Sequence, residues 1–271
     1  MDLMERDAAS STRHPWEISR SDFFARLLSD AGVFQPGLRL LDAGAGDGYV
    51  ARRWMASNQE LDSVTCWDAA YTDDDLRALA THPDQRIAFI RDAPRSKFRL
   101  VVLLDVLEHV EDDTGFLNSV VENYAEDGAT VLISVPAWPS LFSNHDIYIQ
   151  HYRRYRPRQA RELIRGAGLS IVNEGGLFHG PLLARSAQKT VAPLLPAPES
   201  QGVGAWNKSA WLTRATLQAF RADNSVSRFL ASRGIGLPGL SWWARCIKNA
   251  QPAPRRTNPA LSTDPARPDG V

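Results

Sequence analysis

Apolar and polar residues alternate along this chain with two different periods, which predicts strands and helices in turn. Short continuous apolar runs predict buried strands at residues 38–42, 63–67, 87–90, 100–104 and 129–135. Amphipathic patterns predict helices at residues 14–28, 49–58, 73–80 and 114–124. Strands that alternate with helices are typical of an α/β fold with a doubly wound, mostly parallel sheet and helices on both faces.

The second half of the chain continues this alternation and then departs from it. Pro157 opens a predicted helix at the position where proline is favoured, and a strand follows over residues 169–173. A helical stretch is then predicted around residues 211–220, and a closing strand at residues 240–247. The predicted sheet therefore has seven strands, with a helical insertion (about residues 177–233) before the last one.

The composition places these elements in one globular domain, predicted at residues 14–250. The chain has 271 residues, of which 44% are hydrophobic, enough for a sizeable core. We expect a flexible leader at residues 1–13, because this stretch is polar and has no apolar core of a secretory signal. A disordered tail is predicted at residues 251–271, which contain five prolines and no apolar periodicity.

Charge, hydropathy and cysteine content indicate which partners to expect and in which cell compartment the protein works. The 31 lysines and arginines balance 31 aspartates and glutamates, so no overall field attracts nucleic acid. No apolar run reaches the roughly 18–20 residues of a membrane span. Cys66 and Cys246 are too few for a disulfide framework or a metal cluster, so we expect reduced thiols in a cytoplasmic protein.

A glycine-rich turn after the first strand predicts a cofactor site. Gly44, Gly46 and Gly48 occupy every second position, which differs from the G-x-G-x-x-G spacing of dinucleotide-binding loops. A bulky Tyr49 stands where the third glycine would fall, and Asp47 inside the loop would repel phosphates. The loop therefore favours a cofactor without a pyrophosphate and disfavours an oxidoreductase that uses NAD.

Four segments together resemble the class I S-adenosylmethionine (SAM)-dependent methyltransferases. Residues 41–48 are similar to that family's first motif, in which the loop holds the amino-acid end of SAM. Asp68 matches the acidic residue that binds the ribose hydroxyls, and Asp92 matches the position that meets the adenine. Residues 103–110 are similar to the fourth-strand motif beside the sulfonium. The resemblance spans about residues 39–173 and implies a Rossmann-like fold.

The same resemblance implies a set of SAM-binding residues, which lie in these four motifs. They are Asp42, Gly44, Ala45, Gly46, Gly48, Asp68, Ala69, Asp92, Ala93, Asp105 and Val106. Trp16 and Arg20, on the first helix, resemble a segment that closes over the cofactor in one bacterial branch of these enzymes (type 11/12-like). The alternative is a packed tryptophan and a solvated arginine.

The candidates for acid–base chemistry follow the fifth strand, at the sheet edge where ligands bind in this class of fold. His145 and His151 are candidate bases, since imidazole titrates near neutral pH, and Asp146 could orient one of them. The segment resembles an Asp…His-x-Arg-Arg-Tyr run of the same bacterial branch, with Gln150 in place of the usual glycine. A hydrogen-bonding or core role for each histidine is the alternative.

Arginines near the next helix predict an anionic partner. Arg153 and Arg154 stand close to the N-terminus of the helix that starts at Pro157, where the helix dipole disfavours cations by about 0.3–1 kcal/mol. We therefore expect one of them to meet a carboxylate or phosphate on the acceptor, with His109 and Tyr155 as further acceptor-binding residues. A solvated helix face is the usual explanation for such a run.

A divalent metal is a further alternative, which the sequence does not favour. Asp105, Glu108 and His109 resemble an acidic-x-x-Glu-His run that holds a metal in some quinone-pathway O-methyltransferases. Asp105 stands at the first position of this run, where its short side chain reaches less far toward a metal than a glutamate would. We favour a structural role in which Glu108 and His109 cap the turn, with no metal.

The insertion and the cofactor motifs together lead to an expected function. Residues 177–233 carry Trp206, Trp211, Phe220 and Phe229, and arginines at seven-residue spacing, which favours a cover over the acceptor pocket. A helix resting on a membrane, in weak peripheral contact, is the alternative. We expect methyl transfer from SAM to a small-molecule or lipid-linked acceptor, neutral or anionic, most readily at oxygen. An N-methyltransferase or a non-catalytic SAM-binding scaffold remains as an alternative.

Overall fold

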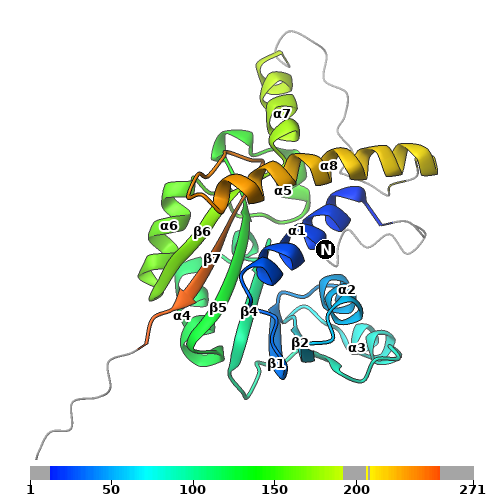
Figure 1. Cartoon of the computed structure of the whole chain (residues 1–271), viewed down its shortest axis with the longest axis vertical. Coiled ribbons are helices and arrows are strands. Elements are labelled where there is room, and N and C mark those ends of the chain that lie inside the picture. Colours follow the sequence, from blue (N-terminus) through cyan, green and yellow to red (C-terminus); the bar gives the residue numbers. More distant parts are fainter. Residues whose placement is uncertain (1–12, 192–205, 207, 251–271) are drawn as a thin grey trace, which may run out of the picture.

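A seven-stranded sheet lies at the centre of the computed structural model, in the order β3-β2-β1-β4-β5-β7-β6 (Figure 1). Its strands are β1 Leu38–Ala43, β2 Leu61–Trp67, β3 Ile87–Ile90, β4 Phe98–Leu104, β5 Ala125–Pro136, β6 Leu169–Leu177 and β7 Ser241–Lys248. β7 runs antiparallel to its neighbours β5 and β6, and the other pairs are parallel. The predicted mostly parallel sheet of seven strands is thus confirmed.

The structure describes residues 13–191, 206 and 208–250. The predicted tail and all but one residue of the predicted leader lie outside the described residues, as does part of the insertion. Within the described ranges, no helix is both long enough and apolar enough to cross a bilayer.

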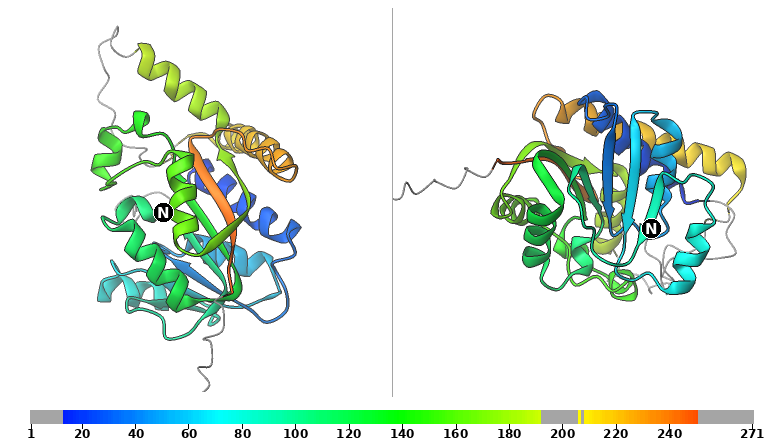
Figure 2. Two further views of the ribbon diagram at one scale, coloured as in Figure 1. Left: turned by 90° about the vertical axis from the view of Figure 1, so that its left-hand side faces the viewer. Right: turned by 90° about the horizontal axis from the view of Figure 1, so that it is seen from below.

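Helices cover both faces of the sheet (Figure 2). They are α1 Pro15–Asp30, α2 Tyr49–Ser57, α3 Asp73–Ala80, α4 Asp113–Tyr124, α5 Asn144–Tyr148, α6 Pro157–Gly166, α7 His179–Val191 and α8 Ala210–Ala231. Two short 3₁₀ turns, η2 Leu107–His109 and η3 Pro139–Leu141, lie at the ends of β4 and β5.

Alternating side chains of the central strands build two separate cores. Leu100 and Val102 of β4 pack with apolar residues of α1 and α2 on one face. Val101 and Leu103, which point the other way, pack with α4 and α6. Both faces of β4 are buried, which explains its continuous apolar sequence.

The insertion is more helical than the sequence pattern predicts. α8 is about twice as long as the predicted stretch, and α7 was not predicted at all. The first turn of α7 contains Gly180 and Pro181, which are typical of a break, but proline is well tolerated in the first turn of a helix. The helical insertion before the last strand is otherwise as expected.

The parallel strands bring four loops to one edge of the sheet. The glycine loop follows β1, Asp68 follows β2, Asp92 follows β3 and Asp105 follows β4. Because β3, β2, β1 and β4 are consecutive parallel neighbours, their carboxyl ends lie side by side. α1 crosses this region beneath α8, which packs along it (Figure 1).

Candidate active site

The glycine loop takes a backbone conformation that requires glycine. Gly44, Gly46 and Gly48 have φ angles of 72°, 53° and 68°. A Cβ on Gly44 would lie 2.6 Å from the Val106 side chain, and one on Gly48 would overlap the Phe89 ring. The loop is therefore pressed against the ends of both β3 and β4.

The carboxylate of Asp68 supports the loop and retains capacity for a ligand. Its two oxygens accept hydrogen bonds from the backbone N–H of Gly46 (2.9 Å) and of Ala70 (3.0 Å). An ionised carboxylate has about four acceptor sites, so each oxygen keeps a lone pair for a ribose hydroxyl. The half-buried Asp68 thus fits a vicinal diol, and the exposed Ala69 follows it.

The remaining cofactor candidates differ in accessibility. Asp92 and Ala93 are exposed beyond the end of β3. Asp42 is buried under the glycine loop, and burial raises its pKa to about 7. Ala45 is also buried. Direct contact with SAM thus remains a prediction, to which Asp92 and Ala93 are better suited than Asp42.

Residues before and within α1 hold the loop region through two ion pairs. Arg20 pairs with Asp105, which also accepts a hydrogen bond from the Ser134 hydroxyl (2.8 Å). Asp105 has a φ of 58°, in the left-handed region. Arg13 pairs with Asp47 and lies over the Tyr49 ring. Burial would raise the pKa of Asp47, but Arg13 holds it below its usual range.

Trp16 of α1 packs against aromatic side chains of neighbouring elements. Its ring stacks on Phe178, with ring centroids 3.5 Å apart, and meets Phe220 of α8 edge-on. Arg20 is buried, so the solvated arginine of the alternative interpretation is not observed. Trp16 thus contributes to the packing of α1 against α8.

Asp146 orients His151, and this pair is the clearest acid–base arrangement at the sheet edge. Nδ1 of His151 lies 3.1 Å from Asp146 Oδ1. Because a carboxylate only accepts, Nδ1 carries the proton and Nε2 is left as the basic nitrogen. The other Asp146 oxygen accepts from the Ser143 backbone N–H and hydroxyl, and Arg154 also donates to Asp146 (2.7 Å).

Electrostatics keep Asp146 ionised. Its burial would raise the pKa, but the hydrogen bonds from His151 and Arg154 outweigh burial and hold the pKa of Asp146 well below its usual range. His145, half-buried in α5, has a pKa lowered by burial. Of the two candidate histidines, His151 is the one that hydrogen-bonds the carboxylate.

Glu108 is fully buried beside this pair. Among the described residues, neither of its carboxylate oxygens has a hydrogen-bond partner, and Oε1 lies 3.8 Å from Nε2 of His151. Burial raises the pKa of Glu108 to about 8. Glu108 is therefore largely protonated at neutral pH. In the same cluster, the His109 ring packs edge-on against the His151 ring.

The metal-binding alternative takes a different form from the one the sequence suggested. Asp105 is held by Arg20 and Ser134, so it does not converge with Glu108 and His109. In the described ranges, ligand atoms of Glu108, His109 and His151 lie within 4.8 Å of one another. Imidazole and carboxylate groups suit a divalent ion, but such an ion would occupy Nε2 of His151, the basic nitrogen of the pair.

Arg153 and Arg154 both form ion pairs with carboxylates of this chain. Arg153 donates to Asp113 (3.1 Å), and Arg154 donates to Asp146. Tyr155 is buried and donates to Asp113 (2.7 Å). The helix-dipole argument for an anion on the acceptor therefore no longer applies to these arginines, because the chain itself supplies the carboxylates.

Several residues of the site were not predicted from the sequence. Tyr71 donates to the Gly46 carbonyl (2.6 Å), Ser134 holds Asp105, and Asp113 links Arg153 with Tyr155. Gln150, which replaces a glycine of the resembled segment, has a φ of 59°. Only this last position carried a sequence signal, because glycine is favoured where φ is positive.

Comparisons with known proteins show the family to which the chain belongs. The family model described as a methyltransferase domain matches residues 16–174. A Mycolicibacterium smegmatis protein named "Probable S-adenosylmethionine-dependent methyltransferase" is 28% identical over 212 residues, 73% of this chain and 77% of that protein. A ubiquinone biosynthesis O-methyltransferase from Rhodopseudomonas palustris is 26% identical over 167 residues, 55% of this chain. That match spans 65% of the enzyme's length, less than two thirds.

The fold has counterparts among solved structures. A candidate sarcosine dimethylglycine methyltransferase from Galdieria sulphuraria superposes with a TM-score of 0.54, and the match covers 86% of each chain. The two sequences are 14% identical, so this likeness concerns the fold.

Proposed function

This chain belongs to the methyltransferase domain family and is a class I SAM-dependent methyltransferase, and we propose that it methylates a hydroxyl oxygen. The proposed acceptor is a small molecule or a lipid-linked one. The observation that carries this proposal is the hydrogen bond between Asp146 and His151. His151 lies beside Glu108, which belongs to the turn that follows β4.

The pair suits an acceptor that must lose a proton. SAM, when bound, supplies an activated methyl group, so positioning alone accounts for much of the acceleration. A hydroxyl is a poor nucleophile until its proton leaves, whereas a neutral amine already has a free electron pair. His151 Nε2 takes the hydroxyl proton as the oxygen attacks, and Asp146 stabilises the imidazolium that forms.

Further support for oxygen comes from one relative. The Rhodopseudomonas palustris protein is named as an O-methyltransferase, although it is only 26% identical. For the cofactor, we propose that the glycine loop, Asp68 and Asp92 hold SAM and that Arg20 and Trp16 belong to its cover. The free acceptor sites of Asp68 support this assignment.

α7 has the contacts expected of an acceptor cover. Arg185 donates to the Ser143 hydroxyl (2.9 Å), and Lys189 donates to the Ser140 carbonyl. Ser143 also donates to Asp146, so α7 is bonded to the segment that orients the proposed base. We propose that the acceptor binds between this segment and the glycine loop.

The test is methyl transfer from labelled SAM to two small acceptors, catechol and benzylamine. We expect label on the catechol oxygen, and a fall in kcat of about 10²–10⁴-fold for His151→Gln. His82→Gln, outside the site, is the control and should behave as the wild type. Label on benzylamine alone would favour the nitrogen alternative, and an unchanged rate for His151→Gln would remove the proposed base.

A further inference from the structure

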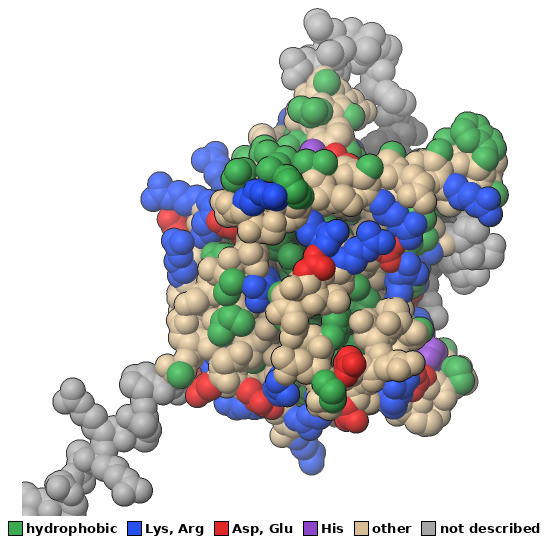
Figure 3. Space-filling model, viewed as in Figure 1, with side chains coloured by type: hydrophobic (Ala, Val, Ile, Leu, Met, Phe, Trp, Pro, Cys, Tyr) green, Lys and Arg blue, Asp and Glu red, His purple; other side chains and the backbone are tan. Residues whose placement is uncertain are grey.

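One face of α8 is apolar and exposed along its whole length. Residues four or three apart share a face of a helix, and here that face carries Trp211, Ala215, Ala219, Ala222, Val226 and Phe229. Trp211 is 72% exposed, Phe229 58% and Val226 49%. Ile235, just beyond the helix, is also exposed. Figure 3 shows apolar side chains gathered at both ends of α8.

The opposite face of α8 is hydrogen-bonded to the rest of the domain and packs against it. These contacts fix the rotation of the helix about its axis, so the apolar face must point outward. Asn224 accepts a hydrogen bond from the Phe178 backbone N–H (3.1 Å), and Ser227 donates to the Gly176 carbonyl (2.5 Å). Phe220 packs against Phe178 and Trp16. α8 therefore presents its apolar face outward in a defined orientation.

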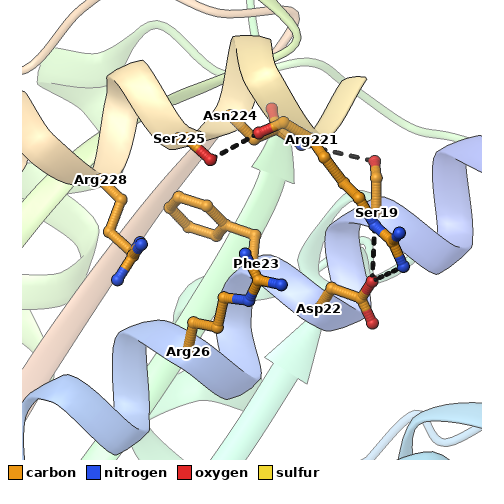
Figure 4. A pocket seen from close by; sticks show the side chains of 8 residues that line it. All are labelled: Ser19, Asp22, Phe23, Arg26, Arg221, Asn224, Ser225 and Arg228. Carbon is orange, nitrogen blue, oxygen red and sulfur yellow. Dashed lines mark hydrogen bonds and ion pairs between the residues drawn. The ribbon is translucent and has the colours of Figure 1, made fainter. Parts of the chain in front are cut away.

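Arginines border this apolar face on the side of α1. Arg214, Arg221 and Arg228 recur every seven residues and so form one line along the helix. Figure 4 shows Arg228 of α8 and Arg26 of α1 reaching into the groove between the two helices. Blue side chains continue this line across the same face of the molecule (Figure 3).

The arginines of this border are only partly neutralised. Arg221 pairs with Asp22 and Arg228 with Asp30. Within the described ranges, Arg26 and Arg214 have no hydrogen-bond or ion-pair partner. The acidic residue of α8, Asp223, instead accepts hydrogen bonds from the backbone at the start of α7. The border therefore carries a net positive charge.

From this arrangement we propose that the outer face of α8 rests on a lipid bilayer that contains anionic phospholipids. An apolar strip with aromatic residues at both ends and a cationic border is the pattern of a helix that lies in the membrane interface. Tryptophan and phenylalanine enter the acyl boundary, and arginines at the border meet lipid phosphates. The proposal does not depend on which acceptor is methylated.

A bilayer fits this surface better than a protein partner does. The strip is about 27 Å long, from Trp211 to Phe229, at 1.5 Å per residue. Its middle consists of three alanines, which offer no side chain to fill a partner's pocket and no pocket to receive one. A fluid lipid surface needs no such complementarity.

The test uses the full-length protein and sedimentation with vesicles of phosphatidylcholine, alone or with about 30% phosphatidylglycerol. We expect binding to the anionic vesicles that weakens as salt rises. Val226→Glu should weaken this binding about tenfold or more, since it places a charge in the apolar strip. Val172→Glu is the matched control, because Val172 has the same 49% exposure but lies on β6.

A second pair of variants tests the charged border. Arg214→Glu should weaken binding to anionic vesicles about tenfold or more, because it replaces a cation with an anion at the lipid surface. Arg165→Glu, on α6, makes the same charge change elsewhere and should leave binding unchanged. The rate at which each of the four variants methylates a water-soluble acceptor is measured as well. A normal rate shows that weaker vesicle binding comes from the changed surface and not from an unfolded or inactive protein.

Three results would overturn the proposal. One is the absence of sedimentation with anionic vesicles. The second is binding that Val226→Glu and Val172→Glu reduce equally. The third is a dimer in analytical ultracentrifugation that Val226→Glu dissociates, which would assign the strip to a second copy of this chain.

Discussion

The guanidinium of Arg20, in α1, pairs with the carboxylate of Asp105 at the end of β4. The arginine side chain is buried, and the aspartate has a left-handed backbone with a φ of 58°. Ser134 of β5 donates to the other oxygen of Asp105. This pair thus ties the first helix to the sheet edge where the cofactor motifs meet.

Removing Arg20 should weaken the binding of SAM. Arg20→Ala leaves Asp105 without its cation and frees α1 from β4, so we expect about a tenfold loss of affinity by isothermal titration calorimetry. Stability should also fall, by about 3 kcal/mol. Arg77→Ala breaks an exposed ion pair with Asp74 and is the control. An unchanged affinity for SAM in Arg20→Ala would remove α1 from the cofactor site.

Glu108 should make the protein less stable as the pH rises. Its pKa is about 8 in the folded protein, above its ordinary value of 4.5, because burial disfavours the charge. The folded state therefore holds a proton that the unfolded state loses, and stability falls between about pH 4.5 and pH 8. Glu108→Gln cannot ionise and should reduce this fall by roughly 1–3 kcal/mol.

Urea unfolding at pH 5.5 and pH 8 measures this difference. Asp42, whose pKa burial raises to about 7, contributes in the same direction and is present in both proteins. Glu162→Gln, which alters an exposed ion pair, should follow the wild type at both pH values. An equal loss of stability in wild type and Glu108→Gln would show that Glu108 ionises freely in the folded protein.

Chelation should leave the methyl-transfer rate unchanged. Nε2 of His151 is the proposed base, and an ion bound between Glu108, His109 and His151 would occupy that nitrogen, so the proposed mechanism requires the site to work without a metal. We expect full activity after EDTA treatment and no Co²⁺ absorption bands on titration. Co²⁺ bands that disappear in Glu108→Gln would instead place an ion between Glu108, His109 and His151.

Gly48 should be far less tolerant of substitution than another glycine with a similar backbone. Gly48 and Gly128 have φ angles of 68° and 79°, so alanine is strained at both, by about 1–2 kcal/mol. A Cβ at Gly48 would also overlap the Phe89 ring, whereas nothing lies within 4 Å at Gly128. Thermal unfolding should show an additional loss of about 1–3 kcal/mol for Gly48→Ala. Equal losses would mean that the Phe89 ring moves aside freely.

Local sequence patterns were sufficient for the architecture and for the position of the glycine loop after β1. The apolar run of β4, buried on both faces, and the glycine spacing after β1 express constraints that act within a few residues. The order of strands and helices then follows from how such elements pack. The same patterns missed α7, where Gly180 and Pro181 are equally compatible with a break or a helix start.

The partners of the charged side chains were decided only by the tertiary structure. Arg20 meets Asp105 across 85 positions, and Arg153 meets Asp113 across 40. Nothing in the sequence near either arginine marks its partner, so the helix-dipole argument that one of Arg153 and Arg154 binds an anion of the acceptor could not take Asp113 into account. Asp146 could orient either neighbouring histidine, and only the fold of the loop selects His151. Hydrogen bonds depend on distance and direction in space, which periodicity along the chain does not contain.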